Sequence, residues 1–143
     1  MRSFKYIYTF NSKQNMDEEN SKATLSEPQF ALMRILWKNP DSNVAQIVEL
    51  MRAVRPLAHT TIATMLMRLE KRGLVQTRKD GRQLIYTAAV TEDEVQKSML
   101  AELLSSAFLG NAKALLNHLV HEEGLTEADL QDLRKQIKQK KTQ

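Results

Sequence analysis

The sequence contains no cysteine, four glycines, three prolines and a single tryptophan among its 143 residues. Without cysteine the chain has no disulfide framework, no thiolate metal site and no cysteine nucleophile. So few glycines and prolines leave little room for long loops, whereas the content of Ala, Leu, Met, Glu, Lys and Gln favours helices. The absence of cysteine fits a cytoplasmic protein.

Long apolar runs and catalytic motifs are also absent from the sequence. No stretch approaches the roughly 20 apolar residues that a membrane span requires, so we expect no membrane insertion. The basic N-terminus, MRSFKYIYTFNSKQN, lacks the apolar core of a signal peptide. No nucleophile elbow, phosphate-cradling glycine loop or HExxH motif is present. We therefore expect no enzymatic activity and no cofactor, and we assign no catalytic residue and no metal site.

Residues 1–24 are predicted to form an N-terminal extension. Its first part contains four aromatic residues in alternating positions, a pattern that suits a strand: Phe4, Tyr6, Tyr8 and Phe10. Residues 11–23 are polar and typical of a flexible linker. A gene-model extension, with translation starting at Met16, explains the same stretch equally well.

The positive charge is concentrated in the middle of the chain. Residues 24–90 contain ten Lys and Arg against five Asp and Glu, whereas residues 91–143 contain seven against nine. The net charge of the whole chain is +4. A basic middle part followed by a slightly acidic one indicates that only the middle part meets a polyanion such as nucleic acid.

Two short amphipathic helices are predicted first. Ser26 and Gln29 form a capping box with Pro28 in the first turn, and the helix they open ends at residues 39–41. Its apolar positions are Phe30, Met33, Leu36 and Trp37. Asn43, or Ser42 before it, caps the second helix, whose apolar residues fall at helical spacing: Ile47, Leu50, Met51 and Val54.

A third helix and a hairpin follow in residues 58–88. The helix spans residues 59–72, with Gly73 as the residue after its C-cap and a poor N-cap in Ala58. Its buried stripe is predicted to be Ile62, Met65, Leu66 and Leu69. Residues 74–78 and 83–88 are predicted strands. Between them, Asp80-Gly81 predicts a type I′ turn, whose central residues both need a positive φ.

Three helices followed by a hairpin is the element order of a winged helix-turn-helix. We therefore predict a mainly α fold, with a winged-helix DNA-binding domain at residues 25–90 and a helical dimerisation domain at residues 91–143. Capping boxes at Thr91/Glu94 and Thr126/Asp129 open two of the C-terminal helices.

The predicted C-terminal helices carry more apolar surface than a small winged helix can cover, so we expect a homodimer. The dimerisation residues are predicted to be Leu100, Leu103, Leu104, Phe108, Leu115, Leu116, Leu119, Leu130, Leu133 and Ile137.

Residues 55–82 contain seven Lys and Arg against two acidic residues. Contacts from such cations to phosphates supply sequence-independent affinity for nucleic acid. Sequence specificity needs side chains in the N-terminal half of a recognition helix, where threonine hydroxyls and methyls can reach base edges. The DNA-binding candidates are His59, Thr60, Thr61, Thr64, Arg68, Lys71, Arg78, Lys79 and Arg82.

Two other functions fit parts of the sequence. A winged helix can serve as a protein-interaction module, which would bind its partner independently of salt and would not bind duplex DNA. His118 and His121 lie three residues apart on a predicted helix, with Glu122 and Glu123 beside them, and this spacing could serve a metal- or ligand-sensing regulator.

Three segments, LSEPQFALMRILWKN, TTIATMLMRLEKRGLV and LIYTAAV, resemble the BlaI/MecI penicillinase-repressor family, which includes copper-responsive CopY-type repressors. The resemblance extends from about Leu25 to Lys138. Its most specific part is the T-I-x-T-x-L-x-R-L-x-K-x-G run from Thr61 to Gly73. It implies a winged helix, a helical dimerisation domain and repression through a palindromic DNA operator.

The resemblance also assigns residues. Thr60, Thr61 and Thr64 match recognition positions, Arg68 lies near the DNA backbone, and residues 78–82 form the wing. Ala63 departs from the Arg or Gln that is common in relatives.

In β-lactam-responsive members a membrane sensor-protease leads to cleavage of an Asn-Phe bond, where this chain has Glu102-Leu103. The C-terminal cysteines of copper-responsive members are absent here. The resemblance therefore makes a membrane sensor-protease one candidate partner of this chain and leaves the inducing signal open.

Overall fold

The computed structural model describes residues 24–142. The predicted aromatic strand and linker of the N-terminal extension lie outside these residues. Contacts within the chain divide it into two compact units, one ending at Glu102 and the other beginning at Leu103. The first compact unit includes the start of α6 (Glu92–Ser106), where Val95 is buried. The division at residues 90/91 into a DNA-binding and a dimerisation domain stays a prediction.

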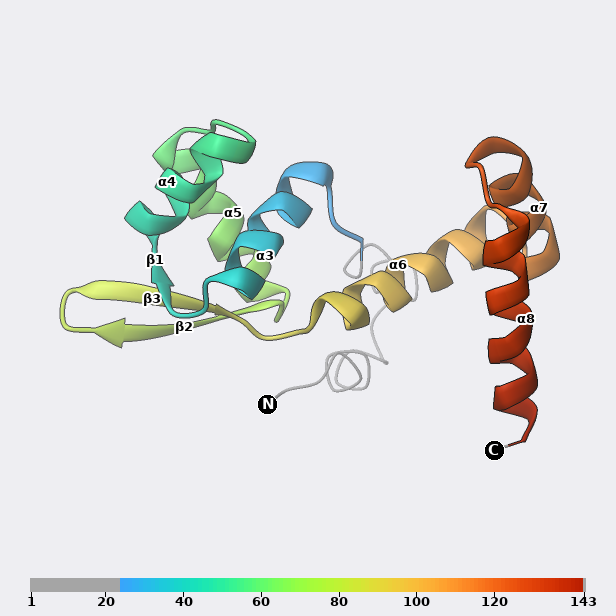
Figure 1. Cartoon of the computed structure of the whole chain (residues 1–143). Helices are drawn as coiled ribbons and strands as arrows, with labels where there is room; N and C mark the ends of the chain where they lie inside the picture. Colours follow the sequence, from blue (N-terminus) through green and yellow to red (C-terminus); the bar gives the residue numbers. More distant parts are fainter. Residues whose placement is uncertain (1–23, 143) are drawn as a thin grey trace. The chain divides into compact units, whose positions relative to one another are not determined.

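The first unit contains α3 (Glu27–Lys38), α4 (Val44–Val54) and α5 (His59–Lys71), followed by the hairpin strands β2 (Val75–Asp80) and β3 (Gln83–Ala88). Figure 1 shows the three helices grouped on one side of the sheet, with the hairpin extending beyond them. A strand of two residues, β1 (Ser42–Asn43), pairs with β3 and completes an antiparallel sheet in the order β1-β3-β2. The structure therefore confirms the winged-helix order and adds a strand that no sequence pattern indicated.

Local capping fixes where the helices begin. Both halves of the predicted box are present at Ser26/Gln29, and Asn43 caps α4 through a box with Gln46. The boxes at Thr91/Glu94 and Thr126/Asp129 are also confirmed. Each box satisfies N–H groups that the first helical turn would otherwise leave without a partner.

The end of α5 is a Schellman motif. Gly73 has φ +80°, as expected of a residue after the C-cap. The Leu74 N–H donates to the Leu69 carbonyl and the Gly73 N–H to the Glu70 carbonyl, both at 2.9 Å. Leu69 and Leu74 are both buried. The motif turns the chain sharply from α5 into β2.

The core confirms the predicted α5 stripe and corrects the one predicted for α4. Ile62, Met65, Leu66 and Leu69 are all buried, whereas Leu50 is 39% exposed and Val54 is 65% exposed. The buried face of α4 is built instead on Ile47 and Met51, with two half-buried valines: Val44 and Val48. Both sets have the same helical spacing, and packing against α3 and α5 selects the more N-terminal one.

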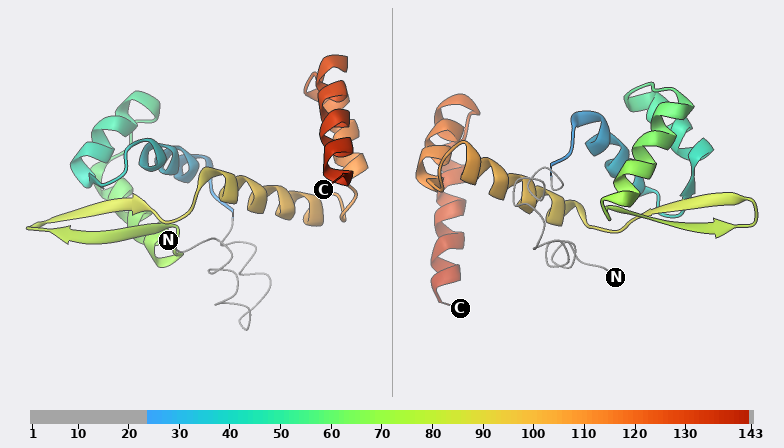
Figure 2. Two further views of the ribbon diagram at one scale, coloured as in Figure 1. Left: turned by 60° about the horizontal axis from the view of Figure 1, so that its bottom comes forward. Right: turned by 180° about the vertical axis from the view of Figure 1, so that it is seen from behind.

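The hairpin turn lies one residue later than predicted. Asp80 pairs with Gln83, so Gly81 and Arg82 are the central residues. Gly81 has φ +62°, and Arg82 is not among the residues with positive φ. Glycine at the first central position with an ordinary second residue is the pattern of a type II′ turn, not type I′. Both views in Figure 2 show the tip of this hairpin standing clear of the helices.

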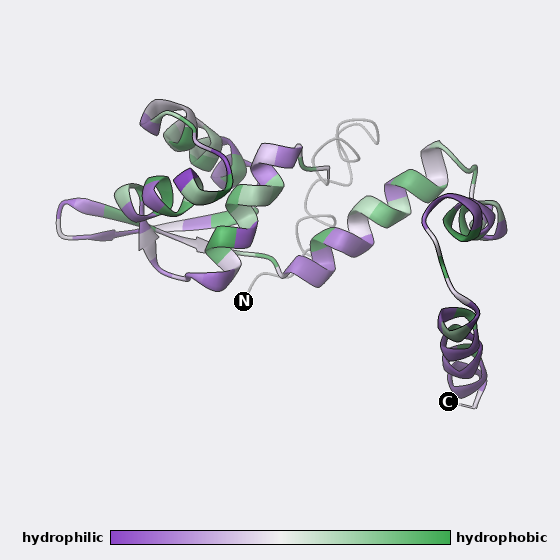
Figure 3. Ribbon diagram, turned by 45° about the horizontal axis from the view of Figure 1, so that its top comes forward, coloured by the Kyte–Doolittle hydropathy of each residue, from purple (hydrophilic) through white to green (hydrophobic). Residues whose placement is uncertain are grey.

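The second unit contains the end of α6, then α7 (Ala112–Glu122) and α8 (Glu127–Lys141). Neither α7 nor α8 has a buried residue. In Figure 3, α8 is mainly hydrophilic, with narrow hydrophobic bands. A contact at 5.7 Å between the ring centroids of Phe108 and His118 joins the turn after α6 to α7.

No helix within residues 24–142 has both the length and the apolar character needed to span a lipid bilayer.

Substitutions at adjacent positions on the two sides of α5 should affect stability by very different amounts. Leu66 is fully buried, and Met67 is 61% exposed. We expect Leu66→Ala to lower the free energy of unfolding by about 2–5 kcal/mol, because it leaves a cavity. Met67→Ala should change it by less than about 0.5 kcal/mol. Urea denaturation followed by circular dichroism measures both, and similar losses for the two variants would contradict the assigned core.

Tyr86 makes the fold sensitive to alkaline pH. Burial and the negative charge of Glu70 raise the pKa of Tyr86 above its ordinary value of 10.0. Above that pH an unfolded chain loses the phenolic proton while the folded chain keeps it, so stability falls as pH rises. The free energy of unfolding should therefore fall more steeply with pH for the wild type than for Tyr86→Phe. The difference should appear between about pH 9.5 and 11, because tyrosine in an unfolded chain has a pKa of about 10. Parallel profiles in urea denaturation would refute this assignment.

Candidate nucleic-acid interface

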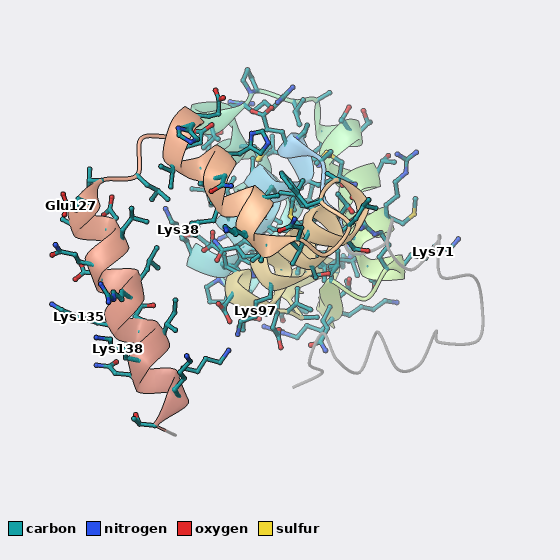
Figure 4. The ribbon with its side chains drawn as sticks, turned by 90° about the vertical axis from the view of Figure 1, so that its right-hand side faces the viewer. Lys38, Lys71, Lys97, Glu127, Lys135 and Lys138 are labelled. Atoms are coloured by element: carbon teal, nitrogen blue, oxygen red, sulfur yellow. The ribbon has the colours of Figure 1, made fainter. Side chains whose placement is uncertain are left out.

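The side of α5 opposite its buried stripe is the surface on which most predicted contact residues lie. The exposed residues are His59, Thr60, Thr61, Arg68 and Lys71, and Thr64 is half-buried. Figure 4 shows the Lys71 side chain extending away from the end of α5. Because the buried stripe holds the helix in one rotational position, these side chains face outward together.

The N-terminus of α5 has no side-chain cap. Ala58 occupies the N-cap position and accepts no hydrogen bond through its side chain, whereas Ser26, Asn43 and Thr126 cap their helices. The first N–H groups of α5 therefore have no side-chain acceptor, and the positive end of the helix dipole lies beside His59 and Thr60. An anion such as a backbone phosphate fits such an end.

The Thr64 hydroxyl is engaged within the helix. Its Oγ1 donates to the Thr60 carbonyl oxygen at 2.9 Å. The hydroxyl oxygen can still accept a hydrogen bond, and the methyl group remains for apolar contact. Thr64 is thus suited to contact a thymine methyl or a base donor rather than to donate a hydrogen bond.

Arg72 belongs to the basic run but serves the fold. Its Nη2 donates to the Thr24 carbonyl oxygen at 2.8 Å, and burial lowers its pKa from the ordinary arginine value. The Thr24 hydroxyl in turn donates to the Glu102 carboxylate. Arg72 therefore ties the end of α5 to the segment that precedes α3.

Cations on the wing divide into paired and unpaired. Nη2 of Arg78 lies 3.7 Å from Oδ1 of Asp41, which also accepts a hydrogen bond from Oγ1 of Thr87 at 2.8 Å. Lys79 and Arg82 are exposed and make no ion pair with any residue between 24 and 142. These two side chains are available to phosphates, and Arg78 becomes available by exchanging Asp41 for a phosphate.

The sequence did not predict the contacts of Asp41 with Arg78 and Thr87. Asp41 joins both strands of the wing to the loop after α3, and its φ of +60° is in the left-handed region. Asp is among the few residues that adopt this conformation readily. An Asp after Pro40 indicates a turn, but nothing local indicates its partners in β2 and β3.

Arg55, near the start of the basic run, is also paired. Its Nη1 lies 3.8 Å from a carboxylate oxygen of Glu27. Such an exposed pair is weak and exchanges readily with other ions.

His118 and His121 on α7 were considered as ligands of a metal ion. Across residues 24–142, no group of three or more His, Cys, Asp or Glu side chains is arranged to hold a metal ion. His118 instead contacts the ring of Phe108.

Residues 25–139 match one protein-family model, described as penicillinase repressor. The transcriptional regulator BlaI of Mycobacterium tuberculosis is 35% identical over 107 residues, which are 73% of this chain and 78% of that protein. The methicillin resistance regulatory protein MecI of Mammaliicoccus sciuri is 23% identical over 122 residues, 85% of this chain and 99% of that protein. A solution structure of monomeric BlaI from Bacillus licheniformis with the blaP half-operator is 28% identical, with a TM-score of 0.44 over 50% of this chain and 87% of that one.

Proposed function

The chain belongs to the penicillinase repressor family, and we propose that it is a transcriptional repressor that binds a palindromic DNA operator as a homodimer. Its α5 enters the major groove, and its β2–β3 wing lies along the backbone of the same site. A bound dimer blocks access to the promoter. Half-sites are expected about one helical turn apart, or a multiple of it.

The outward face of α5, held in place by a buried stripe, is the observation that supports this function most. The face combines an uncapped helix N-terminus, threonines in the first turns, and Arg68 and Lys71 further along. Hydroxyl and methyl groups near the N-terminus of a recognition helix can contact base edges, and cations further along it can contact phosphates.

The residues divide into two roles under this proposal. His59, Thr60, Thr61 and Thr64 contact base edges or the nearest phosphates and set sequence preference. The cations of α5 and the wing contact phosphates and supply affinity that does not depend on sequence: Arg68, Lys71, Arg78, Lys79 and Arg82.

Dimerisation is supported by the composition of the second unit. Leucines recur at helical spacing on α7 and α8, yet neither helix buries a single residue. A unit whose apolar side chains find no core of its own gains stability by burying them against a second copy. On α8 the apolar residues Leu130, Leu133 and Ile137 recur at helical spacing. Figure 4 shows Lys135 and Lys138 projecting from the same helix.

In β-lactam-responsive members of the family a membrane sensor-protease leads to cleavage of an Asn-Phe bond, where this chain has Glu102-Leu103. Glu102 also accepts a hydrogen bond from Thr24.

Removal of Arg68 should weaken binding to every duplex. We expect Arg68→Ala to reduce the salt slope of log K by about 2, because the homodimer loses two phosphate contacts, one from each copy. Fluorescence anisotropy with operator and random duplexes at several salt concentrations measures this. Lys97→Ala is the matched control, since it removes one positive charge from α6, where Lys97 is paired with Asp93 at 2.7 Å.

Thr64 serves as the contrasting variant in the same measurement. Thr64→Ala should change the preference among operator sequences and leave the salt slope unchanged. The expected change in binding free energy is about 1–3 kcal/mol between operators that differ at one base pair. Wild-type behaviour of both Arg68→Ala and Thr64→Ala would show that this face of α5 does not bind DNA.

A charge on the apolar face of α7 should dissociate the dimer. We expect Leu119→Asp to weaken dimerisation by at least about 100-fold, because an unpaired carboxylate is costly to bury. Asn117→Asp introduces the same charge on the opposite side of the same helix and should have little effect. Sedimentation equilibrium distinguishes these results, and a stable Leu119→Asp dimer would exclude this face from the interface.

A further inference from the structure

A groove of about 460 Å³ lies in the first unit, and no residue of α5 is among those that line it. It is lined by the end of α3, the end of β3 and the start of α6. The hydrogen bond from Trp37 Nε1 to the Val90 carbonyl oxygen, at 2.7 Å, joins two of these segments. Its volume lies within the range of small-molecule sites, about 300–1,000 Å³, and no step of DNA binding uses it.

The lining of the groove is apolar with acidic groups at its α6 side. Trp37, Pro40 and Val90 contribute apolar surface, and Glu92 and Glu94 contribute carboxylates. No lysine or arginine is among the lining residues. Nε of Arg34 lies 3.6 Å from Oε1 of Glu92 in an exposed pair, and Glu94 accepts the N–H of Thr91 at 2.9 Å.

We propose that this groove binds a small organic cation that carries its charge beside an aromatic or aliphatic group. The apolar walls bury the body of the ligand, and the carboxylates attract its charge. An indole in the wall adds a favourable contact for a cation, in particular a quaternary ammonium group. An anion of the same size meets two carboxylates and is disfavoured.

The groove also touches the residues that hold the wing. Thr87 lines it and donates to Asp41, the partner of Arg78, and Pro40 precedes Asp41 in the chain. A bound cation therefore lies against the anchor of the wing and alters DNA affinity through it. This consequence rests on the proposed function, whereas binding of the cation does not.

The single tryptophan makes binding directly measurable, because Trp37 lines the groove and is the only such residue in the sequence. Benzyltrimethylammonium is titrated into the full-length protein without DNA, followed by Trp emission and by calorimetry. We expect saturable binding, about fivefold or more tighter than benzyl alcohol, and no saturable binding of benzoate. Equal affinities for the three probes, or preference for benzoate, would overturn the proposal.

Substitutions test whether the carboxylate of Glu92 contributes to binding of the cation. Glu92→Gln should weaken binding of benzyltrimethylammonium by about fivefold, whereas Asp93→Asn, the same change on the neighbouring residue outside the groove, should alter it by less than about twofold. Arg34→Gln should tighten binding, since Glu92 loses a competing partner. Binding that is unaffected by Glu92→Gln, or weakened by Arg34→Gln, contradicts the assignment.

Measurements of probe binding and of DNA binding distinguish failure of this inference from failure of the proposed function. Weaker DNA binding of Arg68→Ala with unchanged probe binding supports a cation site that does not include the outward face of α5. A protein that binds the probe but no DNA retains this inference and refutes the proposed function.

Discussion

Burial of one side of α5 is the constraint on which the rest of the structure depends. Its stripe of Ile62, Met65, Leu66 and Leu69 is packed against α3, α4 and the sheet. Rotation of the helix would bring these side chains into water at a cost of about 2 kcal/mol each. The outward positions of Thr60 and Arg68 are therefore determined by hydrophobic contacts on the far side, and polar interactions play little part in orienting the proposed DNA-binding surface.

Features that depend on neighbouring residues could be predicted from the sequence. A capping box needs residues three apart, and Gly73 needs only its own backbone freedom, so helix boundaries were confirmed. The α4 stripe was half wrong because two sets of residues share Ile47 and Met51, and packing alone decides between them. The turn was wrong because Asp-Gly marks a hairpin without fixing its register, and the pairing of Asp80 with Gln83 is set by the strands.

Contacts between distant residues could not be predicted in the same way. Arg72 reaches Thr24, 48 positions earlier, and Thr87 reaches Asp41, 46 positions earlier. No local pattern distinguishes Arg72 from Lys71, yet one is committed to the fold while the other is exposed. β1 has two residues, too few to show alternation. The candidate site is thus predictable on α5, where periodicity defines the faces, and less so on the wing, where long-range partners decide which cations are free.

These partners set the strength of the proposed DNA contact. Arg72 is held by a carbonyl oxygen, Arg55 by Glu27 and Arg78 by Asp41. This leaves Arg68, Lys71, Lys79 and Arg82 without an acidic partner among residues 24–142. A dimer that places all of these on phosphates makes about eight contacts, which corresponds to a slope of log K against log salt near −7. Exposed pairs such as Arg78–Asp41 exchange at little cost, so release of Arg78 steepens the slope, and the wing anchor at Asp41 becomes the point at which DNA affinity can be adjusted.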